Sequence, residues 1–212
     1  ALRAALRDTD FWVRYHAVRS LARLGAQDVA LELCDLAQND SATPVRIAAV
    51  DALGELRASE AAPHLAQLAY HVDAELALPA ITALGSVADA DGQRTLMKFA
   101  AGSEPRRRAA ALQSLAQRAD ANAIAELSGL ALAQSGTPTM DQAVAALTQI
   151  RDERAYVALL ELTRHPACRA AAVTALTQVG IIAESTLARG LCDPAEDVRH
   201  ATVEVLARMK HS

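Results

Sequence analysis

The chain has 212 residues, 21 of them basic and 25 acidic, which gives a formal net charge of −4. This balance lacks the strong positive field that nonspecific nucleic-acid binding requires, and no uninterrupted apolar run reaches the roughly 18–20 residues of a membrane span. Fifty alanines, only 3% aromatic residues and few β-branched runs indicate a protein made entirely of α-helices.

A short amphipathic pattern recurs along the whole chain. In its clearest copy, Val45, Ala49, Leu53 and Leu56 form one stripe of helical period, and Pro44 precedes it where a helix needs no N–H. Similar stripes begin at positions 13, 45, 76, 107, 139, 168 and 198, so the spacing stays between 29 and 32 residues. A fixed period of this length is typical of a solenoid. We therefore predict one repeat domain over residues 1–212.

Each repeat is expected to hold two helices joined by a short turn. The first helices are predicted near 1–7, 27–38, 59–70, 90–101, 121–133, 153–163 and 181–190. The second helices, which carry the apolar stripe, are predicted near 11–24, 44–56, 74–87, 104–118, 138–150, 167–179 and 195–209. Gly25, Gly85 and Gly180 lie at or near the ends of second helices, where glycine suits a C-cap.

The best copies also share a motif, an aspartate followed five residues later by Val-Arg. It occurs as Asp8…Val13-Arg14, Asp40…Val45-Arg46 and Asp193…Val198-Arg199. Together with the Leu-Gly-x-Leu ending of the second copy, this motif resembles the HEAT repeat. The short period is similar to that of the phycobilisome-lyase-like (E-Z type) subclass. The resemblance implies a right-handed α-solenoid of about seven two-helix repeats of about 31 residues, with the second helices lining its concave surface.

The arginines of the motif are expected to be structural. Placed at the start of successive second helices, they are predicted to form a ladder of hydrogen bonds near successive turns. The alternative is that they bind a ligand. The ladder consists of Arg14, Arg46, Arg108, Arg169 and Arg199.

The sequence predicts no catalytic residue, metal or cofactor. Its six histidines form no H-x-x-x-H or H-x-x-H pair, and the chain lacks the His-Glu dipeptide of the di-iron HEAT-repeat hydroxylases, which have a similar fold. Cys34, Cys168 and Cys192 fit neither a disulfide framework nor a CxxC metal pair, so a reducing cytoplasm is the expected location. The chain does not begin with methionine, as expected of a processed chain or a piece of a longer one.

Two positions of the second helix lie off the apolar stripe and are candidates for the wall of a binding groove. Three consecutive repeats place a glutamine at one of them, and an amide can pair with a peptide backbone as donor and acceptor. Acidic residues toward one end would favour a basic residue on the partner. The alternative is a neutral solvated face. The candidates are Gln113, Gln117, Gln149, Gln178, Asp51 and Glu55.

A second candidate patch is the aromatic cluster of Phe11, Trp12 and Tyr15, half of the six aromatic residues in the chain. Large exposed aromatics often anchor interfaces. The alternative is that they cover the apolar end of the array or are buried against repeats outside this sequence.

These observations predict a non-enzymatic scaffold that binds a segment of a protein or peptide partner along the concave groove. No nucleic acid is expected as a partner, and no membrane span is expected. The alternative that the resemblance implies is a bilin-lyase-like enzyme, or a subunit of one, that handles a chromophore.

Overall fold

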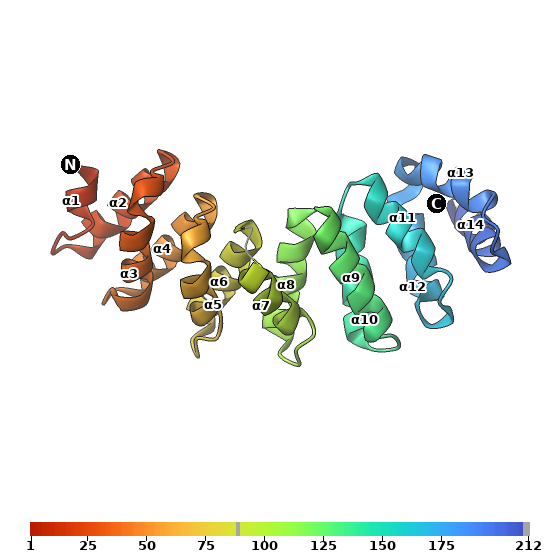
Figure 1. Ribbon diagram of the computed structural model, residues 1–212, viewed down its shortest axis with the longest axis horizontal. Helices are drawn as coiled ribbons and strands as arrows, with labels where there is room; N and C mark the ends of the chain where they lie inside the picture. Colours follow the sequence, from red (N-terminus) through yellow and green to blue (C-terminus); the bar gives the residue numbers. More distant parts are fainter. Residues whose placement is uncertain (88–89, 210–212) are drawn as a thin grey trace. The chain divides into compact units, whose positions relative to one another are not determined.

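The computed structural model describes residues 1–87 and 90–209. Within these ranges the chain forms α-helices and short 3₁₀ helices, and no strand occurs among them (Figure 1). The contacts divide the chain into two compact units, Ala1–Ser114 and Leu115–Ser212, each a stack of helix pairs. The boundary falls within helix α8 (Pro105–Arg118). The all-α solenoid of two-helix repeats is confirmed, whereas a single domain over residues 1–212 stays a prediction.

The helices alternate between the two kinds predicted. The first helices are α1 (Leu2–Ala5), α3 (Ala30–Asn39), α5 (Ala62–Ala69), α7 (Ala90–Ala100), α9 (Ala121–Ala133), α11 (Glu153–Leu162) and α13 (Glu184–Leu191). The second helices are α2 (Phe11–Arg23), α4 (Thr43–Glu55), α6 (Ala74–Ser86), α8, α10 (Pro138–Gln149), α12 (Pro166–Val179) and α14 (Glu196–Met209). Short 3₁₀ helices lead into α3, α5 and α13, namely η1 (Gln27–Val29), η2 (Ser59–Ala61) and η3 (Gly180–Ala183).

Local chemistry explains where the second helices begin. Pro138 and Pro166 are the first residues of α10 and α12, where the missing N–H of proline leaves no hydrogen bond unmade. Asp10 and Asp73 cap α2 and α6, because each side chain accepts a hydrogen bond from a backbone N–H two residues on.

The same turn ends α2 and α4 and sends the chain into the next repeat. After α2, the N–H of Gly25 donates to the Ala22 carbonyl and that of Ala26 donates to Leu21, which is the Schellman pattern. The pattern places one residue in the left-handed region, and Gly25 adopts a φ of 67° there. After α4 the equivalent residue is Arg57, with a φ of 51°. The turn is therefore built with or without a glycine.

In each unit the helices pack in two layers. In the first unit α2 packs on α4 and α4 on α6, while α3 and α5 cover them from the other side. In the second unit α10 packs on α12 and α12 on α14, and α9, α11 and α13 form the other layer. The core between the layers is lined by a leucine from each second helix but the last, all at most 6% exposed: Leu21, Leu53, Leu84, Leu115, Leu147 and Leu176.

Gly85 was expected at a C-cap, and the structure corrects this. It lies inside α6, and the cap residue of that helix is Val87. A side chain at Gly85 would meet Ser114 of α8, since an added Cβ would lie 2.6 Å from the Ser114 Cβ. The glycine therefore allows α6 and α8 to approach closely.

One stretch, Pro166–Leu191, is long and apolar enough by composition to span a membrane, and 39% of its most apolar window is buried. In the structure it is not one helix, because Gly180 turns the chain with a φ of 67° between α12 and η3. A search for uninterrupted apolar runs misses this stretch, because the charged residue Arg169 lies within it.

Candidate functional site

A groove between α10 and α12 contains part of the predicted site. It encloses a cavity of about 420 Å³ within the second unit. Its walls consist mainly of small side chains. The lining residues are Met140, Asp141, Val144, Ala145, Thr148, Ala167, Ala170, Ala171, Thr174, Ala175 and Gln178.

The polar groups in this groove are suited to a peptide backbone. The hydroxyls of Thr148 and Thr174 donate to carbonyls of their own helices at 2.8 and 2.9 Å, which leaves their oxygen lone pairs to accept. The Gln178 amide is exposed and makes no hydrogen bond to another residue of the described ranges, so it offers both donor and acceptor. Asp141 adds an exposed carboxylate. The groove thus combines apolar side chains with hydroxyl acceptors, one amide and one carboxylate.

The other predicted glutamines are exposed but do not line this cavity. Gln149 ends α10, and Gln117 and Gln113 lie on α8. None of the three makes a side-chain hydrogen bond within the part of the chain that the structure describes. Gln113 belongs to the first unit and the other two to the second. A continuous row of four amides therefore stays a prediction.

The predicted acidic pair lies on α4 in the first unit. The Glu55 carboxylate accepts from Arg19 of α2 at 3.2 Å, so its charge has a partner. The pKa of the Asp51 carboxyl is raised overall, chiefly because the surrounding protein desolvates it. Nearby Arg19 acts in the opposite direction, and Glu55 adds to the increase. Of the two carboxylates, Asp51 is the one that would gain more from a cation on a partner.

The aromatic patch is a compact cluster at the start of α2. The Trp12 ring lies 5.0 Å from the Phe11 ring and 5.6 Å from the Tyr15 ring, measured between centroids, and it stacks on His16 at 6.0 Å. Trp12 is 53% exposed, so neighbouring rings support it without burying it. The patch lies on the first repeat, in a different unit from the α10–α12 groove.

The ladder arginines are bonded to the scaffold. Arg169 forms an ion pair with Asp197 of α14 at 3.6 Å. The other four donate to a backbone carbonyl shortly before their own helix: Arg14 to Asp8 at 2.8 Å, Arg46 to Ala37 at 3.2 Å, Arg108 to Gly102 at 2.9 Å and Arg199 to Asp193 at 2.8 Å. The four backbone bonds hold the turn within a repeat, whereas the Arg169 ion pair joins two repeats, and none of the five side chains lines the groove.

Sequence reasoning missed that the motif aspartate receives an arginine from the preceding repeat. Arg14 donates to both Asp40 carboxylate oxygens at 2.7 and 2.8 Å, with the two side chains 12% and 3% exposed. The hydrogen bond from Arg14 holds the pKa of Asp40 below its usual range. In the second unit Asp193 accepts a hydrogen bond at 2.8 Å from Arg164, which follows α11 and is not one of the ladder arginines. A regular period is not enough to show whether such a pair forms within a repeat or between neighbours.

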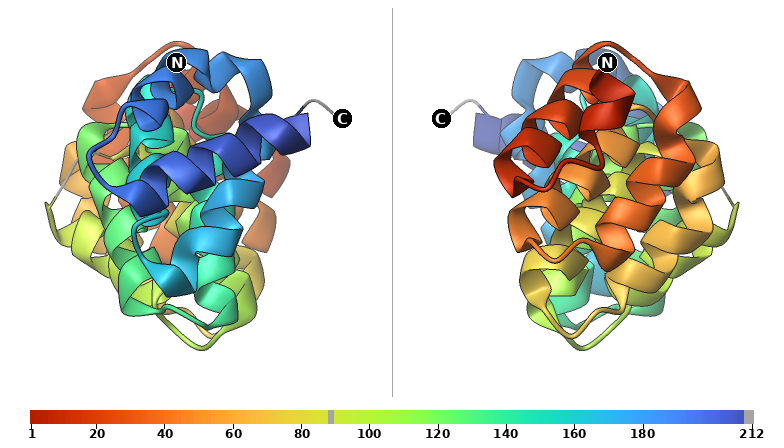
Figure 2. Two further views of the ribbon diagram at one scale, coloured as in Figure 1. Left: turned by 90° about the vertical axis from the view of Figure 1, so that its right-hand side faces the viewer. Right: turned by 90° about the vertical axis from the view of Figure 1, so that its left-hand side faces the viewer.

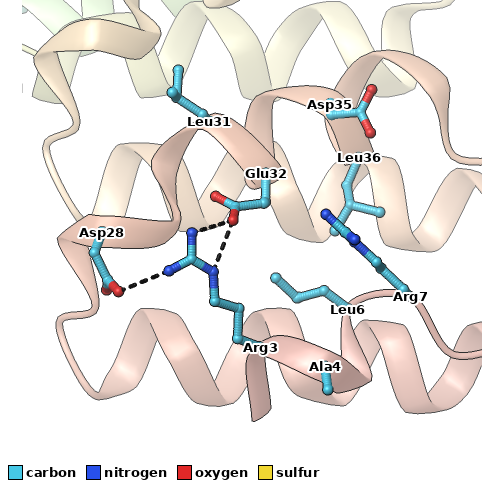
Figure 3. A pocket seen from close by; sticks show the side chains of 9 residues that line it. All are labelled: Arg3, Ala4, Leu6, Arg7, Asp28, Leu31, Glu32, Asp35 and Leu36. Carbon is cyan, nitrogen blue, oxygen red and sulfur yellow. Dashed lines mark hydrogen bonds and ion pairs between the residues drawn. The ribbon is translucent and has the colours of Figure 1, made fainter. Parts of the chain in front are cut away.

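A second cavity, of about 810 Å³, was not predicted. It lies between α1 and α3 at the first repeat, where Arg3 reaches across to Glu32 and to Asp28 (Figure 3). Exposed Leu31 forms part of its apolar wall. The sequence signal for this cavity is the short apolar stripe before Asp8.

No group of three or more His, Cys, Asp or Glu side chains suited to a metal ion occurs within residues 1–87 and 90–209. Cys34 and Cys168 are buried and free, and Cys192 is exposed and free. Burial raises the pKa of the Cys34 thiol to about 11, so it is a poor nucleophile.

Comparisons with known proteins place the fold. Residues 1–85 match the family model for HEAT repeats. No curated protein matches the chain by sequence. Among solved structures, the complex of CpcE and CpcF of phycocyanin lyase from a Nostoc species is similar over 99% of this chain and 92% of that one, with 18% identity and a TM-score of 0.55. Kap95p, solved in a complex with RanGDP, is similar over 98% of this chain and 34% of that one, with 13% identity and a TM-score of 0.53.

At such identities the likeness to solved structures shows the fold alone. The family match and the structural neighbours agree with the Asp…Val-Arg motif, so the resemblance to HEAT repeats is confirmed. Residues 1–85 match the model for HEAT repeats, and the chain as a whole has a helical-repeat fold like that of these solved structures.

Proposed function

We propose that the chain is a non-enzymatic scaffold that binds an extended segment of a partner protein in the groove between α10 and α12. The observation that carries the proposal is the cavity of about 420 Å³ walled by alanines and edged by Thr148, Thr174 and Gln178. The HEAT-repeat fold favours an interaction role, and Kap95p, a protein of similar fold, binds RanGDP.

An extended segment suits this groove because its backbone presents N–H and C=O groups at intervals of about 3.3 Å per residue. The threonine oxygens accept from its N–H groups, and Gln178 pairs with either kind of group. Exposed Ala170 leaves room for the segment to approach α12. Asp141 selects a basic side chain on the partner, in part by speeding its approach.

The remaining predicted residues extend the proposal without carrying it. Gln117 and Gln149 lie in the same unit as the groove and would lengthen the path of the segment. Gln113, Asp51 and Glu55 lie in the other unit. For them we propose a separate contact with basic groups of the partner.

A displayed library of random peptides tests the groove directly. Peptides selected on the wild-type chain are measured against Ala170→Arg, which fills the groove, and against Ala125→Arg, a matched exposed alanine on α9. We expect Ala170→Arg to abolish binding and Ala125→Arg to leave it unchanged. Selected peptides should be rich in Lys or Arg. The Asp141→Asn variant should bind these peptides more weakly, and its binding should depend less on salt concentration. Selected peptides that bind Ala170→Arg as tightly as wild type would contradict the proposal.

The bilin-lyase-like alternative stays a prediction, since the likeness to the phycocyanin lyase shows the fold alone. Co-expression with a chromophore and an acceptor protein tests it, and covalent colour on the acceptor would support it. We further propose a reducing compartment such as the cytoplasm, because the three cysteines are free.

A further inference from the structure

The groove between α10 and α12 has two chemically different ends. Short turns at residues 150–152 and 163–165 join the two helices to α11, so α10 and α12 run in the same direction. α12 contacts both α10 and α14, and α14 lies foremost in the left view of Figure 2. Asp141 lies in the first turn of α10, whereas Thr148 and Gln178 lie in the last turns of their helices. The groove therefore runs from an acidic end to an end with hydroxyl and amide groups.

Asp141 supplies the charge among the residues that line the groove. Its carboxylate is exposed and forms no ion pair or hydrogen bond within the described ranges. Burial raises the pKa of the Cys168 thiol in α12, and the negative charge of Asp141 adds to that increase, so the carboxylate lies close to α12. Arg169 of α12 does not neutralise it, because that arginine pairs with Asp197 at 3.6 Å. The group that complements this end of the groove is a cation on the partner.

The groove is lined by alanine where other second helices carry larger residues. The residue two positions after the start of the apolar stripe is Ala170 on α12, but it is Ile47 on α4 and Leu78 on α6. The residue six positions after the start is Ala145 on α10, but it is Asp51 on α4. Both alanines are exposed. A partner backbone can therefore come closer to α10 and α12 than side chains of the size of isoleucine or leucine would allow.

The two hydroxyls of the groove lie against their own helices. Thr148 donates to the Val144 carbonyl at 2.8 Å, and Thr174 donates to the Ala170 carbonyl at 2.9 Å. A backbone N–H of the partner has to come within about 3 Å of such an oxygen to donate to it. A large side chain between the partner backbone and the helices would hold the backbone farther away. The partner residue that faces the groove beside these hydroxyls must therefore be small.

The spacing of an extended segment matches the spacing of the groove residues on α10. Ala145 lies four residues after Asp141, which is about 6 Å along a helix that rises about 1.5 Å per residue. Two residues of an extended segment cover about the same length at about 3.3 Å each, and their side chains point to the same side. A residue that pairs with Asp141 and the residue two positions away from it therefore both face the groove. The residue between them faces away from it.

We propose that the groove selects a segment in which a Lys or Arg is separated by one residue from a Gly, Ala or Ser. The basic side chain pairs with Asp141, and the small residue lies over Ala145. The backbone of the segment donates to the hydroxyl oxygens of Thr148 and Thr174. This selectivity rests on the function proposed above, since it describes the segment that the groove binds.

A displayed library of short peptides with Lys fixed at the centre and random residues on both sides tests this selectivity. Peptides selected on the wild-type chain should be enriched in Gly, Ala and Ser two positions from the Lys, on one side. The position directly beside the Lys should accept residues of any size. Selected peptides that lose binding to Ala170→Arg but show large residues two positions from the Lys, on both sides, contradict the proposal.

Reversing the charge of Asp141 tests the basic position. Asp141→Lys should bind the selected Lys peptides about fivefold more weakly or worse, because an exposed ion pair is worth about that much. The same variant should prefer versions of these peptides in which Glu replaces the central Lys. Glu184→Lys is the matched control, since Glu184 is an exposed acid on α13 outside the groove. An Asp141→Lys variant that still prefers the Lys peptides removes Asp141 from the contact.

Enlarging Ala145 tests the small position. Ala145→Val adds two methyl groups beside the residue that lies two positions from the Lys. Peptides with Ala there should lose about tenfold more affinity than peptides with Gly, as expected for an extra methyl group in a packed pocket. Ala125→Val, at an exposed alanine of α9, should change neither affinity. An equal loss for the two peptides, or no loss for either, overturns the assignment of the small residue to Ala145.

Failure of this selectivity can be told apart from failure of the proposed function. If a fully random library yields no peptide on the wild type, or only peptides that bind Ala170→Arg equally well, both are wrong. If peptides that require an open groove are selected but lack the basic and small residues at this spacing, only the selectivity is wrong. Circular dichroism of each variant confirms that the fold is retained.

Discussion

Gly85→Ala is the perturbation for which the structure gives the clearest magnitude. The new Cβ would lie 2.6 Å from the Ser114 Cβ and 3.2 Å from its Cα. Carbon atoms pack best at about 3.5–4.0 Å, so α6 and α8 must separate by about 1 Å. Overpacking of this kind costs about 1–3 kcal/mol. Alanine returns about 1 kcal/mol through its helix propensity, so the free energy of unfolding should fall by about 0–2 kcal/mol.

Gly129→Ala on α9 isolates the packing term, because an added Cβ there meets nothing within 4 Å. It should raise the free energy of unfolding by about 1 kcal/mol. Urea unfolding followed by circular dichroism measures both variants, and the two should differ by about 1–3 kcal/mol. In a Ser114→Gly background the Gly85→Ala penalty should shrink. If Gly85→Ala stabilises the chain as much as Gly129→Ala does, α6 and α8 are not packed as the structure has them.

Three further predictions follow from burial and charge. Leu53→Ala should lower the free energy of unfolding by about 2–5 kcal/mol, since Leu53 is fully buried, and an unchanged urea midpoint would contradict this. Because Arg14 lowers the pKa of Asp40 in the folded state, the pair stabilises the fold above about pH 4 and loses its contribution as the pH falls through the lowered value. The difference in unfolding free energy between wild type and Asp40→Asn should therefore shrink from about pH 5 toward pH 2, and a constant difference would argue against the pair. Ellman's reagent should modify exposed Cys192 in the native chain but Cys34 only after unfolding, because burial raises the pKa of that thiol to about 11.

The second helices could be located from the sequence almost to the residue. Their apolar stripes repeat at a nearly constant spacing, and Pro138 and Pro166 mark where two of them begin. The first helices were less exact. We predicted that three of them begin at 27, 59 and 181, yet each α-helix begins three residues later, after a 3₁₀ turn. Hydrophobic spacing within one turn does not distinguish the two kinds of helix.

The candidate site was only partly accessible to the same reasoning. Gln178 was singled out because its position lies off the apolar stripe, and it does line the α10–α12 groove. That position alone does not predict a groove, as exposed Gln149 shows by lying outside the cavity. The difference comes from neighbours such as Ala170 and Ala171, whose small size leaves the space open. The ion pair between Arg14 and Asp40 could not be predicted in this way. It forms between two stacked repeats, and residue types alone do not show how repeats stack.

Periodicity predicts which face of a helix is apolar, but it does not predict whether anything covers that face. Val173 and Val203 are the same residue at the same position of successive repeats, yet they are 1% and 55% exposed. The difference arises because α14 packs on α12, whereas no helix of the described residues follows α14. Since each repeat contacts only its neighbours, the burial of a stripe depends on the array and not on the repeat itself.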